Sequence, residues 1–259
     1  MITAGIDAGM ETTKVVILNG ESDPEWVIIP GGTETTVRLA QRTLDQAAEK
    51  ANISVKEISY IIATGVGREF LSFVNEELPE FQCLATGIYS LLPSTRILLD
   101  LGARKSLAVK CNGGRTVKVA TSSKCASGTG TYLEMVSTIL DVDFQKMTEL
   151  ALQSKKDLKI QSTCAIFAES EIISLVHDGA KPEDIIRGVF RGISGRIYPH
   201  LLELGIEKDV SVVGGVAKSK VMIAALEEIV GSEILVPENP EIVGALGAAL
   251  IAREKGSKI

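Results

Sequence analysis

Two of the four cysteines, Cys125 and Cys164, each stand just before a segment that is patterned as a helix. Backbone N–H groups at the start of a helix are unpaired and carry a partial positive charge, which suits an anion or an anionic metal cluster. The same field lowers the pKa of a thiol, and the resulting thiolate is a better metal ligand. Two interpretations stand: a pair of metal ligands, or two buried small side chains. Spacing alone favours the second, the commonest fate of a lone cysteine.

A second pattern is an Asp-Xaa-Gly turn that follows a short apolar strand. It occurs twice, at Asp7–Gly9 and at Asp100–Gly102. In such a hairpin, backbone N–H groups can cradle a phosphate while the Asp orients a hydrated Mg²⁺. Each turn alone also fits an ordinary hairpin with a turn glycine. The repeat indicates an internal duplication, and two such hairpins facing across a cleft could grip one triphosphate.

Glycines form two further patterns late in the chain. Gly214 and Gly215 follow an apolar run, and a glycine pair at such a place lets a flat ring approach the backbone. The final helix is rich in Gly and Ala, including Gly244–Gly247, which predicts close packing on a neighbouring element.

Hydrophobic patterning predicts the elements that position these residues. The expected strands are 2–7, 14–18, 26–29, 58–64, 97–101, 106–110, 116–121, 210–213 and 233–236, and the long helices are 34–51, 182–204 and 241–254. Cys83 is expected in a linker after Pro79, and Cys111 at the end of a strand. Pro93 marks the boundary between an N-terminal lobe, 1–94 with 238–259, and a second lobe, 95–237, that carries Cys125 and Cys164.

Composition narrows the function classes. With 259 residues, of which 45% are hydrophobic and 23% charged, the chain can build a real core. A net charge of −6 argues against a nucleic-acid or anionic-membrane surface. The cysteines lack the spacing of a disulfide framework or a CxxC zinc site. The sequence has neither a signal-peptide pattern nor a membrane-span pattern, so a cytoplasmic protein is expected.

The ordered hairpins, glycine turn and final helix resemble the sugar kinase/actin/heat-shock-chaperone ATPases, an α/β fold of two duplicated ribonuclease H-like domains. The segments Lys124–Gly130 (KCASGTG) and Cys164–Glu171 (CAIFAESE) are similar to signatures of the BadF/BadG/BcrA/BcrD ATPases. Ala63–Arg68, Gly214–Ala217 and Gly244–Ala249 also match, so the resemblance spans nearly the whole chain. Members of that family activate 2-hydroxyacyl-CoA dehydratases or serve benzoyl-CoA reductase.

The resemblance implies an ATP-dependent electron-activating protein. One 4Fe–4S cluster would be shared between two subunits, each giving Cys125 and Cys164, in a homodimer or in a heterodimer with a related ATPase subunit. The electron would come from a ferredoxin or flavodoxin and pass to an acceptor acyl-CoA dehydratase or reductase. No nucleic-acid or membrane partner is expected.

The resemblance also assigns roles to residues. Asp7 and Asp100 would position Mg²⁺ and the attacking water, while Gly214 and Gly215 would lie against the nucleoside. Glu169 could assist water activation, although an exposed carboxylate near a helix start is the preferred interpretation. The residues expected to hold the phosphates are Gly9, Thr12, Thr13, Lys14, Gly102, Gly128, Thr129 and Gly130.

The chain departs from the usual family pattern at two places. Met10 and Glu11 stand where a Ser/Thr pair is usual, and Ala103–Lys105 replaces a Gly-Gln-Asp run, which is more like the D-type reductase component. Glu11 either weakens ATP binding and slows hydrolysis or faces solvent without effect. Two other functions stay open: a small-molecule kinase of the same fold, and a regulatory subunit that binds nucleotide with little hydrolysis.

Overall fold

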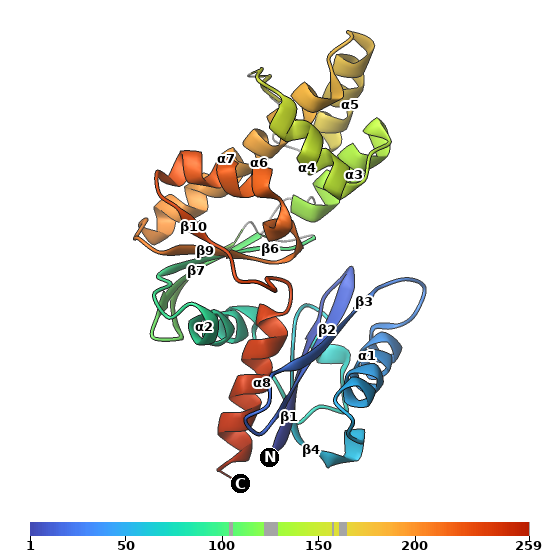
Figure 1. The fold of residues 1–259 in the computed structure, drawn as a ribbon, viewed down its shortest axis with the longest axis vertical. Helices are drawn as coiled ribbons and strands as arrows, with labels where there is room; N and C mark the ends of the chain where they lie inside the picture. The colour runs from blue at the N-terminus through green and yellow to red at the C-terminus, as the bar shows by residue number, and fades with distance from the viewer. Residues whose placement is uncertain (104–105, 122–128, 157, 161–164, 259) are drawn as a thin grey trace. The chain divides into compact units, whose positions relative to one another are not determined.

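The computed structural model describes residues 1–103, 106–121, 129–156, 158–160 and 165–258. The chain forms two compact units (Figure 1). The first unit comprises Met1–Thr95, Cys111–Val117 and Pro237–Ile259, and the second comprises Arg96–Lys110 and Lys118–Val236. Within the described residues, no helix combines the length and the apolar character that a membrane crossing requires.

The first unit is built on a mixed sheet with the strand order β3-β2-β1-β4-β5. Its central strand β1 pairs antiparallel with β2 and parallel with β4. The alternation of side chains along β1 and β2 gives the sheet two apolar faces, as expected for a sheet covered on both sides. The strands are β1 (Ile2–Ala8), β2 (Thr12–Asn19), β3 (Glu25–Pro30), β4 (Ile58–Thr64) and β5 (Glu76–Glu77).

Three helices cover this first sheet. Helix α1 (Thr36–Lys50) packs on one face through Leu44 and its neighbours. Helix α8 (Val243–Gly256) packs on the other face and crosses α2 (Glu80–Leu91) at very short range (Figure 1). A Cβ on Gly247 would lie 1.7 Å from the Cys83 carbonyl oxygen. The close packing predicted for the Gly- and Ala-rich final helix is therefore confirmed.

The second unit repeats this plan. Its sheet has the order β10-β9-β6-β7-β8, and its central strand β6 pairs antiparallel with β7 and parallel with β9. Strands β6 and β7 thus correspond to β1 and β2, and β9 corresponds to β4. The strands are β6 (Ile97–Leu101), β7 (Ser106–Asn112), β8 (Arg115–Thr121), β9 (Val210–Val213) and β10 (Ile234–Leu235). The internal duplication expected from the two Asp turns is present in the strand order.

Helices of the second unit form the larger apolar core. Helix α6 runs through it, with Phe190 fully buried at its middle. Pro182 at the first turn of α6 supplies a helical φ, and Gly205 with a φ of +74° ends the helix. The helices are α3 (Thr129–Leu140), α4 (Phe144–Gln153), α5 (Ala165–His177), α6 (Pro182–Leu204) and α7 (Lys220–Val230).

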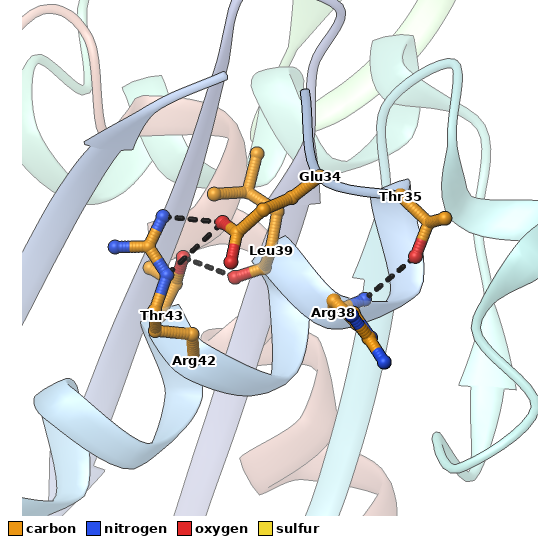
Figure 2. Close-up of polar contacts among 6 residues, drawn as sticks. All are labelled: Glu34, Thr35, Arg38, Leu39, Arg42 and Thr43. Atoms are coloured by element: carbon orange, nitrogen blue, oxygen red, sulfur yellow. Dashed lines mark hydrogen bonds and ion pairs between the residues drawn. The ribbon is translucent and has the colours of Figure 1, made fainter. Parts of the chain in front are cut away.

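Three sequence-based placements differ from the structure. Helix α1 begins at Thr36 and not at Glu34. Thr35 caps the helix, because its side chain accepts a hydrogen bond from the Arg38 backbone N–H (Figure 2). Glu34 lies before the helix and binds the Arg42 guanidinium. Cys83 lies inside α2 and not in a linker, since Pro79 is the N-cap of that helix. The strand expected at 106–110 extends to Asn112 as β7, and Cys111 lies at its end, where it was expected.

Candidate functional site

The first Asp turn joins β1 to β2. Asp7 lies opposite Lys14 in the antiparallel ladder, and the Lys14 ammonium is 3.2 Å from Asp7 Oδ2. The two side chains are only 18% and 16% exposed, so this ion pair is partly desolvated. A Cβ on Gly9 would lie 2.6 Å from the Thr12 carbonyl oxygen and 3.3 Å from Lys14 Nζ, so the turn leaves no room for a side chain.

The other residues of this turn differ in access. Thr12 is partly buried, whereas Thr13 is fully buried and its hydroxyl has no hydrogen-bond partner within the part of the chain that the structure describes. The Thr13 side chain therefore does not reach the surface of the turn. Met10 is 53% exposed, and Glu11 is partly buried with its carbonyl accepting a hydrogen bond from the Gly31 N–H.

The end of the neighbouring strand β4 completes the surroundings of Asp7. Thr64 pairs with Asp7 in the parallel ladder, and Gly65 follows in the left-handed region with a φ of +88°. A Cβ on Gly65 would lie 2.5 Å from Asp7 Oδ1. Arg68 closes the loop by donating to the Gly65 carbonyl at 3.0 Å. The site prediction missed Gly65, although it lies in the segment Ala63–Arg68 that carries part of the family resemblance.

Among the described residues, the second Asp turn repeats the glycine contact of the first and differs in the residue that faces the carboxylate. Asp100 on β6 pairs with Val213 of β9, and Gly214 follows with a φ of +87°. A Cβ on Gly214 would lie 2.7 Å from Asp100 Oδ1. The residue opposite Asp100 in the antiparallel ladder is Leu107, which brings no positive charge where Lys14 stands in the first turn. Gly215 is exposed at the start of the short 3₁₀ segment Gly215–Lys218.

The N-terminus of α3 packs directly on the second Asp turn. The Gly130 N–H donates to the Gly102 carbonyl at 3.1 Å, and the Thr129 and Ser106 hydroxyls are 2.8 Å apart. A Cβ on Gly130 would lie 2.7 Å from Ala103 Cα, so glycine is required for this approach. The structure therefore brings together Gly102, Thr129 and Gly130, which the sequence predicted for one function. Ser106 was missed, since a lone Ser at a strand start carries no distinguishing pattern.

The structure describes only some of the remaining predicted site residues. Cys125, Cys164 and Gly128 lie outside the described residues. Glu169 is exposed on α5 but lies beyond the first turn of that helix, which begins at Ala165. The other two cysteines are buried, and burial raises the pKa of the Cys83 thiol and of the Cys111 thiol to about 12. Both thiols are therefore protonated at neutral pH.

Each Asp turn can hold an anion together with a cation. Carboxylate oxygens suit Mg²⁺, and successive backbone N–H groups in a turn suit phosphate oxygens. The first turn adds the Lys14 ammonium. The residues present therefore fit a magnesium–phosphate ligand, with carboxylates and backbone amides as its contacts.

Solved structures share this fold. An activator of 2-hydroxyisocaproyl-CoA dehydratase from Clostridium difficile, solved with bound ADPNP, aligns with a TM-score of 0.93 and 33% identity over 100% of this chain and 96% of that chain. A ROK family glucokinase from Streptomyces griseus aligns with a TM-score of 0.63 at 12% identity over 98% of this chain and 100% of that chain. The second likeness concerns the fold alone. The predicted two-lobed sugar kinase-like α/β fold is confirmed.

Curated relatives point to one family. An activator of lactoyl-CoA dehydratase from Anaerotignum propionicum is 36% identical over 100% of this chain and 100% of the relative. A component of benzoyl-CoA reductase from Thauera aromatica is 28% identical over 96% of this chain and 92% of the relative. The family model for these ATPases matches residues 4–252. The chain therefore belongs to the BadF/BadG/BcrA/BcrD ATPase family.

Proposed function

We propose that this protein is an ATP-dependent activator that passes a low-potential electron to an acyl-CoA dehydratase or reductase. The observation that carries the proposal is the repeated Asp turn, in which a glycine with a positive φ lies against the carboxylate in each copy. The relatives of this chain are named as activators of such enzymes. The ADPNP bound to the similar Clostridium difficile activator supports ATP as the ligand of these turns.

In this proposal both turns contribute to the nucleotide site. Lys14 adds positive charge near a phosphate, because its ammonium lies beside the Gly9 turn. Asp7 and Asp100 position a hydrated Mg²⁺ and the attacking water. The N-terminus of α3, which packs beside Gly102, contributes the partial positive charge that favours a phosphate. Gly214 and Gly215 remain proposed contacts of the nucleoside, and Glu169 a proposed aid to water activation.

We further propose that Cys125 and Cys164 hold a 4Fe–4S cluster together with the same pair from a second subunit. A cubane cluster takes four thiolates, and Cys83 and Cys111 are unsuited because burial keeps them protonated. The cluster would supply a one-electron carrier fed by a ferredoxin or flavodoxin. The second subunit is either another copy of this chain or a related ATPase subunit.

Anaerobic purification tests this function. The wild type is expected to be a brown dimer with about four irons per dimer and to hydrolyse ATP. Cys125→Ser and Cys164→Ser lose the iron–sulfur absorbance, whereas Cys111→Ser, the matched control, keeps it. A colourless protein that phosphorylates a small molecule would instead establish the kinase alternative.

The regulatory-subunit alternative is favoured by one feature, the Met10 and Glu11 pair. Two like charges about 4 Å apart repel by roughly 4 kcal/mol at an effective dielectric of 20, and solvent reduces this. If Glu11 weakens the phosphate site, Met10→Ser with Glu11→Thr raises both ATP affinity and turnover. Unchanged affinity and turnover would show that the pair is neutral.

A further inference from the structure

Two glycines occupy equivalent places beside the two carboxylates. Gly65 follows the partner of Asp7 in the parallel ladder of the first sheet, and Gly214 follows the partner of Asp100 in the second. Their φ angles are +88° and +87°. The Cβ positions would lie 2.5 and 2.7 Å from Oδ1 of the respective Asp, and 2.6 Å from the next backbone carbonyl oxygen in both cases.

A positive φ alone does not explain these contacts. Gly20 and Gly231 are also left-handed, with φ angles of +61° and +73°, yet a Cβ at either would meet no atom within 4 Å. A side chain at Gly20 or Gly231 would cost backbone strain only. At Gly65 and Gly214 it would in addition enter the space that the carboxylate occupies, since real Cβ contacts are essentially never shorter than 3.0 Å.

The contact restricts the carboxylate on one side. With Oδ1 of Asp7 against the Gly65 backbone and Oδ2 bonded to Lys14, the carboxylate is held from both oxygens. Oδ1 of Asp100 lies in the same way against the Gly214 backbone. A carboxylate with a fixed rotamer binds a cation without first losing side-chain freedom, which favours a preorganised site.

We propose that Gly65 and Gly214 are positioning residues that fix the Asp7 and Asp100 carboxylates in the orientation that receives Mg²⁺ and its water. This inference rests on the proposed ATP-dependent function. For Gly214, the contact with Asp100 is a second reason why glycine is needed, in addition to the proposed approach of a nucleoside. Gly65 was assigned no contact with the nucleotide, and its contact with Asp7 gives it a role.

The first test uses double-mutant cycles in urea unfolding, which need no ligand. Gly65→Ala is made in the wild type and in Asp7→Ala, and Gly214→Ala in the wild type and in Asp100→Ala. We expect each glycine substitution to lower the unfolding midpoint less when the carboxylate is absent. Gly20→Ala and Gly231→Ala, the matched controls, lower it equally in both backgrounds. Equal losses for Gly65→Ala and Gly214→Ala in both backgrounds would overturn the inference.

The second test measures ADPNP binding as a function of Mg²⁺ concentration. Gly65→Ala and Gly214→Ala are expected to raise the Mg²⁺ needed for half-saturation at least about tenfold, the effect of a misplaced ligand group. Gly20→Ala and Gly231→Ala leave it unchanged within about twofold. A loss of ADPNP affinity that is the same at every Mg²⁺ concentration would assign these glycines to backbone shape and not to carboxylate orientation.

The outcomes separate this inference from the proposed function. A wild type that binds no ADPNP contradicts the function, while the unfolding cycles still measure the contact between glycine and carboxylate. If Gly65→Ala does not fold, the double variant with Asp7→Ala is expected to fold. Failure of both would show that the Ala8 carbonyl, and not the Asp7 carboxylate, requires glycine, and would overturn the inference at this position.

Discussion

Asp7 and Asp100 are equivalent in backbone position but differ in the residue across the ladder. Lys14 lies opposite Asp7, and Leu107, which is 2% exposed, lies opposite Asp100. Both copies of the duplicated turn therefore have the carboxylate and the adjacent glycine, Gly65 or Gly214, but they differ in the residue that faces the carboxylate. The two turns place a lysine and a leucine, respectively, across the ladder from the carboxylate.

The Lys14–Asp7 pair is expected to contribute to stability because it is partly desolvated. Lys14→Met leaves the carboxylate without this partner and should lower the free energy of unfolding in urea by about 1–3 kcal/mol. The matched control is Lys146→Met, since Lys146 and Glu149 are also 3.2 Å apart but about half exposed. That exposed pair should contribute about 0–1 kcal/mol. Equal losses in the two variants would show that burial does not strengthen the Lys14–Asp7 pair.

The buried cysteines predict a dependence of stability on alkaline pH. Burial raises the pKa of Cys83 and of Cys111 from 9.0 to about 12. Below pH 9 both states hold the proton, and between about pH 9 and 12 only the unfolded chain loses it. The unfolded state then binds fewer protons, so the free energy of unfolding falls as pH rises, by up to about 1.4 kcal/mol per pH unit for each thiol.

Removing these thiols should flatten that decline. Unfolding free energies of Cys83→Ala and Cys111→Ala, measured in urea from pH 8 to 11, are expected to fall less steeply than those of the wild type. The three proteins are otherwise identical in sequence, so the difference in slope isolates the thiol. Parallel curves for wild type and variant would contradict the assignment.

At the residue scale, sequence prediction succeeded where chemistry and local pattern coincide. Gly102, Thr129 and Gly130 were predicted together and lie together, because Asp-Xaa-Gly and Gly-Thr-Gly are contiguous motifs. Gly65 was missed as a site residue because its importance arises from a parallel strand about sixty positions away in the chain. Residues paired across parallel strands are far apart in the sequence, so no short motif predicts their contact.

At the element scale, the bounds of several elements followed from sequence signals. The predicted ranges 58–64, 97–101, 182–204 and 210–213 are those of β4, β6, α6 and β9. These strands are mostly apolar, and α6 begins at Pro182 and ends at its C-cap, Gly205. Helix α2 was missed because it contains Gly87, which weakens a helical pattern and is explained only by the approach of α8.

The crossing of α2 and α8 yields a prediction about these two elements. Gly247→Ala places a methyl group 1.7 Å from the Cys83 carbonyl oxygen, so the helices must separate. Overpacking typically lowers the free energy of unfolding by about 1–3 kcal/mol. Gly247→Ala should reach or exceed the upper end of this range, because the methyl group would meet a backbone atom. Gly195→Ala is the control, because Gly195 lies within α6 and a Cβ there meets no atom within 4 Å.

The control should change stability in the opposite direction. An alanine in an open helical position stabilises by about 0.5–1 kcal/mol relative to glycine. Thermal or urea unfolding of the two variants therefore separates helix propensity from packing. A Gly247→Ala variant as stable as the wild type would show that α2 and α8 can move apart without loss.

At the scale of the whole molecule, the two units repeat one strand order around one kind of turn. This repeat could be predicted because both Asp turns and their flanking strands are visible in the sequence. The bounds of the two units were expected at 94/95 and 237/238, and the structure places them at 95/96 and 236/237, with residues 111–117 grouped with the first unit. The Thr116 hydroxyl donates to the Phe81 carbonyl of α2, a long-range contact within the first unit that leaves no signal in the sequence of the hairpin itself.

The repeat makes a final prediction about the whole protein. If the Asp turns bind Mg²⁺ and phosphate as proposed, ADPNP with Mg²⁺ at one hundred times its Kd should raise the free energy of unfolding by about 2.7 kcal/mol, because the ligand binds only the folded chain. Asp7→Asn and Asp100→Asn should each remove most of this gain, because each carboxylate belongs to one of the two proposed Asp turns. Asp45→Asn, a control at an exposed position of α1, should keep the full gain. Unfolding in urea with and without ligand measures all four proteins. A full gain in Asp100→Asn together with its loss in Asp7→Asn would mean that the first turn alone binds the nucleotide and that the second retains the fold of the duplication without its function.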